Sequence, residues 1–102
     1  MATALTYSNF IAAIKSVYNT AHNNGYRYGD SHATPPCADG FISCDRLIAR
    51  ALWNMGYTDQ PVSTTTTSGI TVFNVGTYLP KYGFIKTTSK AAIRPGAVIC
   101  VG

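Results

Sequence analysis

Glutamate is missing from this sequence, and the only acidic residues among its 102 positions are Asp30, Asp39, Asp45 and Asp59. A glycosidase requires two carboxylates that face each other across the scissile bond, so the shortage of acids argues against glycosidase chemistry. Each aspartate lies in a turn-rich segment or near the end of an expected helix. We therefore interpret the four aspartates as turn and cap residues.

Long apolar runs and nucleotide-binding motifs are missing too. No stretch approaches the roughly 18 apolar residues of a membrane span, and the N-terminus lacks the basic and apolar segments of a signal peptide. Neither a Walker loop, nor a GxGxxG motif, nor the spacing of an EF-hand occurs. A length of 102 residues, with 46% hydrophobic and 12% charged residues, predicts one globular domain over residues 1–102.

Cysteine and histidine are scarce. Cys37, Cys44 and Cys100 form no CxxC pair, which argues against a disulfide framework and a structural zinc site. The sequence still allows one disulfide bond, between Cys37 and Cys44 across a short loop. With only His22 and His32 beside the cysteines, we expect no metal and no cofactor.

The net charge of +4 comes from eight lysines and arginines that are scattered along the chain. A nucleic-acid-binding domain would cluster such charges among aromatic residues, so we expect no nucleic-acid partner. A mildly basic surface suits attraction to an anionic cell wall, and solubility alone explains it equally well.

Two helices and a long loop are predicted from the periodicity. Apolar residues recur every three or four positions between residues 7 and 23, as in an amphipathic helix, with Thr6 or Ser8 as its cap. His22 falls in the last turn, where the helix dipole favours a cation, and we expect it to be a surface residue. Closely spaced glycine and proline predict a loop over residues 25–43, and long loops often carry a binding or catalytic edge.

The second helix is predicted from Cys44 to Gly56, because apolar residues repeat at helical spacing from Cys44 to Met55. Ser43 can cap it, and Asp45 complements its dipole. The spacing puts Cys44 in the first turn, on the face turned toward the protein. Two interpretations stay open: a small buried apolar residue, or a nucleophile whose thiolate form is favoured by the helix N-terminus and completed by a nearby His.

Residues 26–30 (YRYGD) and 40–44 (GFISC) resemble the Y-x-x-G-G and D-C-S-G-F patterns of NlpC-type cell-wall cysteine peptidases, a papain-like group that also includes CHAP amidases. Residues 83–86 and 93–99 resemble the short strand and the L-x-P-G-D-I-V segment of that family. The chain departs from the pattern around the cysteine: Ser43 stands where Asp is usual, and Asp45 stands where Ser is usual.

The resemblance implies an α+β, papain-like fold with N-terminal helices packed on a small antiparallel sheet. Apolar residues between positions 72 and 82 fit a helix that ends near Pro80, and their β-branched character also fits a strand. We choose the helix, partly on the resemblance, which also implies a sheet strand over residues 97–101. The resemblance further implies that Cys44 attacks an amide carbonyl of a peptidoglycan stem or cross-bridge peptide, and that the hydroxyl of Tyr26 lies beside the thiol.

The family's general base is a His that follows the Pro-Gly turn, and no His follows Cys44 in this sequence. We therefore expect a chain truncated at its C-terminus, whose missing strands would carry the base. Two alternatives stay open: His32 serves as the base in a permuted arrangement, or the domain is non-catalytic or unrelated. An unfinished sheet would leave an open edge that can pair with another chain.

The sequence thus predicts a peptidoglycan hydrolase, either a cysteine endopeptidase or an amidase. It would be made in the cytoplasm and act at the bacterial cell wall, as a phage or prophage lysin does. The alternative function is that of a non-catalytic cell-wall-binding or phage structural domain that keeps the scaffold.

Overall fold

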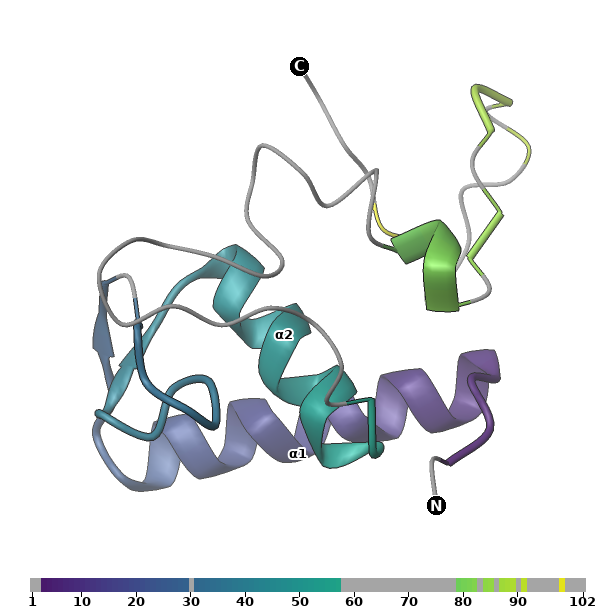
Figure 1. Ribbon diagram of the computed structural model, residues 1–102. Helices are drawn as coiled ribbons and strands as arrows, with labels where there is room; N and C mark the ends of the chain where they lie inside the picture. Colours follow the sequence, from purple (N-terminus) through teal and green to yellow (C-terminus); the bar gives the residue numbers. More distant parts are fainter. Residues whose placement is uncertain are drawn as a thin grey trace.

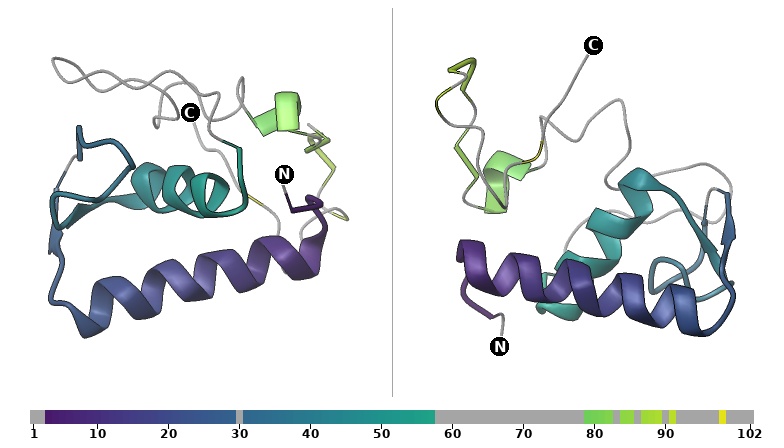
Figure 2. Two further views of the ribbon diagram at one scale, coloured as in Figure 1. Left: turned by 60° about the horizontal axis from the view of Figure 1, so that its bottom comes forward. Right: turned by 180° about the vertical axis from the view of Figure 1, so that it is seen from behind.

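The computed structural model describes residues 3–29, 31–57, 79–82, 84–85, 87–89, 91 and 98. In chain order these residues form helix α1 (Tyr7–Asn23), strands β1 (Arg27–Tyr28) and β2 (Phe41–Ile42), helix α2 (Cys44–Asn54) and the 3-10 helix η1 (Leu79–Tyr82). Figure 1 shows α2 packed on α1, with the two strands beyond the C-terminal end of α1 and η1 above its N-terminal end. Figure 2 shows the same arrangement from two further directions.

Helix α1 begins and ends where the sequence predicts. Thr6 is the N-cap, and its hydroxyl accepts a hydrogen bond of 3.2 Å from the backbone N–H of Asn9. Asn24 is the C-cap, and Gly25 follows with a φ of 65°, a left-handed conformation that commonly ends helices. The buried face repeats every three or four residues and consists of Phe10, Ala13, Val17 and Ala21.

The C-terminal half of α2 packs as the apolar stripe predicts. Ala51, Leu52 and Met55 are buried and join Phe10 and other α1 residues in the core. Phe84 packs against this core, and its ring meets that of Phe10 edge to face at a centroid distance of 5.1 Å. The core therefore ties the segment after η1 to both helices.

The N-terminal half of α2 is buried on a different face, and this corrects the prediction for Cys44. Asp45 and Arg46 are buried here, whereas Cys44 is exposed. The prediction that Cys44 faces the interior is wrong, because the apolar stripe follows only the packing of α2 against α1. The stripe carries no information about the loop that covers the other side of the first turns of α2.

That covering loop lies between β1 and β2. The Cys37 thiol donates to the backbone oxygen of Arg46 at 3.6 Å, and a guanidinium N–H of Arg50 donates to the backbone oxygen of Pro36 at 3.0 Å. Within the loop, the Ser31 hydroxyl donates to the Asp39 carboxylate at 2.8 Å. These bonds hold the loop against α2 and bury the polar side of its first two turns.

The two strands pair in parallel, with Arg27 opposite Phe41 and Tyr28 opposite Ile42. The prediction of an antiparallel sheet is therefore wrong for the strands that the structure describes. Parallel neighbours need a crossover of about a dozen residues, and the loop over residues 29–40 supplies that length.

The remaining predicted elements lie mostly outside the described residues. Of the helix predicted within residues 72–82, only residues 79–82 are described, and they form η1. Of the strand predicted over residues 97–101, only Val98 is described, and it is partly buried against the core. Among the described residues, no helix combines the length and the apolar character needed to cross a membrane.

Candidate functional site

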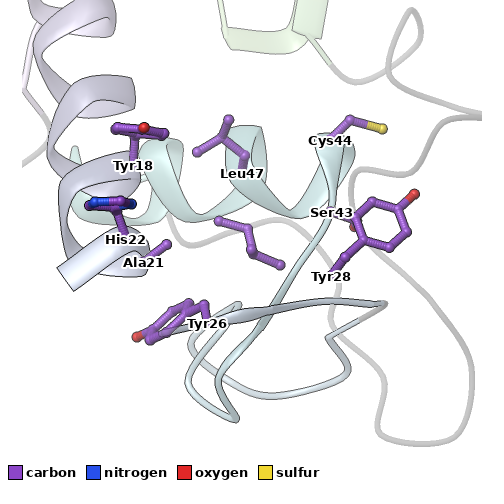
Figure 3. A pocket seen from close by; sticks show the side chains of 9 residues that line it. Tyr18, Ala21, His22, Tyr26, Tyr28, Ser43, Cys44 and Leu47 are labelled. Atoms are coloured by element: carbon purple, nitrogen blue, oxygen red, sulfur yellow. The ribbon is translucent and has the colours of Figure 1, made fainter. Parts of the chain in front are cut away.

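A pocket of about 300 Å³ lies between the C-terminal end of α1, the two strands and the first turn of α2 (Figure 3). Its lining consists of Tyr18, Ala21, His22, Tyr26, Tyr28, Ile42, Ser43, Cys44 and Leu47. Small-molecule sites begin at roughly this volume, so the pocket suits one residue or ring of a larger substrate. None of these described lining residues is Asp, Glu, Lys or Arg.

Cys44 is the first residue of α2 and is exposed, although its neighbours on both sides are buried. Ser43 is the N-cap, as predicted, but its side chain makes no capping bond to the helix backbone. Instead the Ser43 hydroxyl donates to the Asp45 carboxylate at 2.5 Å, and the same oxygen accepts from the backbone N–H of Arg46 at 2.9 Å. The thiol is thus presented outward from a turn that is anchored on its inner side.

Cys37 provides an internal contrast to Cys44. Both thiols are free, so the bridge that the sequence allows is not formed. Cys37 is 1% exposed and has a φ of 68°, a left-handed conformation that is unusual for a residue other than glycine. Burial raises the pKa of the Cys37 thiol to about 11. At neutral pH Cys37 is therefore a protonated, inaccessible thiol.

Tyr26 and Tyr28 both line the pocket, but they stand at different ends of it. The backbone N–H of Tyr26 donates to the backbone oxygen of Ala21 at 2.9 Å, which fixes Tyr26 at the end of α1. Tyr28 pairs with Ile42, two positions before Cys44. Figure 3 shows Tyr28 on the Cys44 side of the pocket and Tyr26 on the α1 side. The sequence singled out Tyr26, and the structure adds Tyr28.

His22 is a lining residue that sequence reasoning assigned to the surface alone. It is exposed, and its ring stacks on that of Tyr18 with centroids 5.9 Å apart and an interplanar angle of 9°. The signal in the sequence is the spacing of four residues between Tyr18 and His22, which puts both on one face at the end of α1. Only the fold brings that face against the strands and α2.

His22 does not lie beside the thiol. Figure 3 shows His22 and Cys44 at opposite ends of the pocket, with Leu47 between them and the Cys44 sulfur turned away from His22. His32 is half-buried in the loop and does not line this pocket. Among the described residues, no three of the types His, Cys, Asp and Glu gather closely enough to hold a metal ion.

Comparisons of this chain with protein-family models, with curated proteins and with solved structures returned no match. The site is therefore defined by its own geometry: an exposed cysteine at a helix N-terminus that opens on a pocket rich in aromatic side chains.

Proposed function

We propose that this protein is a cysteine hydrolase that attacks amide bonds in the stem or cross-bridge peptides of peptidoglycan. The observation that carries the proposal is the exposure of Cys44 at the pocket, between the buried Ser43 and Asp45. The likeness of residues 26–30 and 40–44 to NlpC-type peptidases supports the substrate class. The described residues have the α+β content that the resemblance implies, although their two strands are parallel.

In the proposed reaction, the Cys44 thiolate adds to the carbonyl carbon of the scissile amide. The N-terminus of α2 favours negative charge, first on the sulfur and then on the oxyanion of the tetrahedral intermediate. The carbon–nitrogen bond then breaks, the amine leaves with a proton, and water hydrolyses the thioester to a carboxylate and the free thiol. Each turnover consumes one water molecule.

Proton transfer is the slow step of the proposed reaction. His22 lies across the pocket from Cys44, so protons are exchanged with water and not with an adjacent imidazole. A positioned general base contributes about 100- to 10,000-fold to such a reaction. We therefore expect weak hydrolysis, and we take thiol reactivity and substrate binding as the primary measurements.

The proposal is tested by alkylation with iodoacetamide near neutral pH, followed by mass spectrometry of the labelled peptides. We expect Cys44 in the folded protein to react faster than Cys44 in the urea-unfolded chain, because only the folded helix supplies its dipole. Buried Cys37 is the matched control and stays unlabelled while the protein is folded. A folded Cys44 that reacts no faster than Cys37, or no faster than in urea, contradicts the proposal.

Loss of turbidity of purified cell walls then measures hydrolysis. We expect slow clearing by the parent protein and by Cys37→Ala, and none by Cys44→Ala. The position of His22 favours a second candidate function, a non-catalytic wall-binding domain that uses the same pocket. That function predicts wall binding by the parent and by Cys44→Ala alike, with no clearing by either protein.

A further inference from the structure

Three polar residues are buried around the exposed Cys44. Ser43 is 8% exposed, Asp45 is 6% exposed and Arg46 is 1% exposed. They come from one turn at the start of α2, which the covering loop contacts at the backbone oxygen of Arg46, and Ser43 also lines the pocket. Cys44 is therefore an exposed residue between buried polar neighbours.

A buried cluster of this composition is costly for a small domain. Burying a carboxylate and a guanidinium requires desolvation that their mutual attraction does not always recover, and well-packed apolar residues are often as stabilising. The burial of Asp45 and Arg46 is therefore weak evidence for stability. The Ser43 and Asp45 side chains, in addition, join directly across Cys44, which gives them a positional role there.

We propose that the hydrogen bond from Ser43 to Asp45 is a brace that spans Cys44 and holds its backbone and thiol in the attacking position. Ser43 and Asp45 are then positioning residues, and this role rests on the proposed function of Cys44 as a nucleophile. The NlpC-type pattern has Asp before the cysteine and Ser after it, whereas this chain has the two in the reverse order. A hydrogen bond between a hydroxyl and a carboxylate requires one Ser and one Asp, and it can form with either residue first in the sequence.

The Asp45 carboxylate beside Cys44 accepts two hydrogen bonds, one from the Ser43 hydroxyl and one from the backbone N–H of Arg46. Hydrogen bonds to an ionised carboxylate are among the stronger ones in proteins. The titratable groups that line the pocket with Cys44 are Tyr28 on its own side and Tyr18, His22 and Tyr26 on the α1 side. On the loop side, Arg46, Arg50, Asp39 and Asp45 lie close enough to Cys37 to act on its thiol.

The experiment compares two serines that each donate to an aspartate. Ser43→Ala removes the brace. Ser31→Ala removes the partly buried bond to Asp39 and the bonds that the Ser31 hydroxyl accepts from the backbone N–H groups of Ala33 and Cys37, far from the thiol in sequence. We expect Ser31→Ala to lose at least as much thermal stability as Ser43→Ala. At neutral pH we expect alkylation of Cys44 to slow by about three- to tenfold in Ser43→Ala and by less than about twofold in Ser31→Ala. Ser43→Thr keeps the hydroxyl and restores the parent rate.

Asp45→Asn gives a signature that a purely structural role does not. The amide oxygen still accepts from Ser43 and Arg46, while the negative charge beside the thiol is removed. We expect the rate of Cys44 alkylation at neutral pH to stay at or above the parent rate, opposite to the effect of Ser43→Ala. Equal effects of the two alanine variants, or failure of Ser43→Thr to restore the rate, overturns the brace even if Asp45→Asn does not fold.

The alkylation rate measures the reactivity of the Cys44 thiol and requires no cell-wall substrate. A parent protein that clears no cell walls therefore overturns the hydrolase proposal and leaves the brace to be judged by the alkylation rates. If the parent clears cell walls but alkylation of Cys44 is unchanged in Ser43→Ala, the hydrolase proposal is supported and the brace is overturned.

Discussion

The ring of Tyr18 lies parallel to the ring of His22 one helical turn away, with centroids 5.9 Å apart. The pair forms the α1 side of the pocket that Cys44 borders from α2. Tyr18 is nevertheless 60% exposed, so most of its surface is open to a ligand. A substrate held across the pocket would contact this pair at one end and the thiol at the other.

Replacing Tyr18 should therefore weaken substrate binding. We expect Tyr18→Ala to raise the dissociation constant for soluble cell-wall peptide fragments by about five- to tenfold, the usual effect of losing one aromatic contact. Calorimetric titration of the Cys44→Ala protein, which lacks the proposed nucleophile, provides the measurement. Tyr7 is 61% exposed on the same helix but does not line the pocket. Tyr7→Ala is the matched control, and an equal effect of both variants would exclude a ligand role for Tyr18.

Cys37 should make the protein less stable at high pH. Its pKa is raised to about 11 in the folded protein from an ordinary 9.0, so between these values the unfolded chain releases a proton that the folded chain keeps. Stability is then fully present below about pH 9 and declines as the pH rises toward about 11, by up to about 3 kcal/mol. Urea unfolding at pH 8, 9, 10 and 11 measures the decline. Cys37→Ala should lose less stability over this range, and an identical decline would assign the effect to other groups.

Leu52 should be a major source of core stability. It is 0% exposed and lies in the cluster between α1 and α2. We expect Leu52→Ala to lower the free energy of unfolding by about 2–5 kcal/mol, through lost burial and the cavity that remains. The urea midpoint should fall with an unchanged m-value. Ile85, which is 89% exposed, provides the apolar control, and Ile85→Ala should change stability by less than about 0.5 kcal/mol.

Gly29 should be required by the ring of Phe41. A Cβ at position 29 would lie 3.0 Å from Cδ1 of Phe41, closer than ordinary contact. We expect Gly29→Ala to cost about 1 kcal/mol, and a smaller amount in a Phe41→Ala background where the ring is absent. Thermal unfolding of the four proteins completes the cycle.

Gly25→Ala is the control for that cycle. Gly25 has a φ of 65° and no neighbouring atom within 4 Å of an added Cβ, so its cost of about 1 kcal/mol arises from the backbone. That cost should be the same with or without the Phe41 ring. Additive effects of Gly29→Ala and Phe41→Ala would contradict the proposed contact.

Much of the helical structure could be predicted from local patterns. The bounds of α1, its Thr6 cap and the stop at Gly25 depend on periodicity and on side-chain bonds within a few residues. The same holds for the start of α2 at Cys44 and for the loop before it. The direction of the sheet could not be predicted this way, because it depends on how the loop over residues 29–40 carries the chain back to β1.

The candidate site could be predicted only in part. Helical spacing placed Cys44 at the start of α2 but on the wrong face, because the buried side of the first turn is polar and packs against a loop. Tyr26 was identified from its resemblance to a motif, whereas Tyr18, His22 and Tyr28 carried no such signal. Their common feature is a shared pocket, which is a property of three elements packed together.

The sequence by itself determined the two helices, the Thr6 cap of α1 and the presence of a cysteine at a helix N-terminus, since each depends on interactions between residues close in the chain. The tertiary structure alone decided that Cys44 is exposed while Asp45 and Arg46 are buried, and that His22 faces the same pocket from its far end. Burial is set by what packs on each face of a helix, and here the covering atoms come from loop residues that apolar periodicity cannot register.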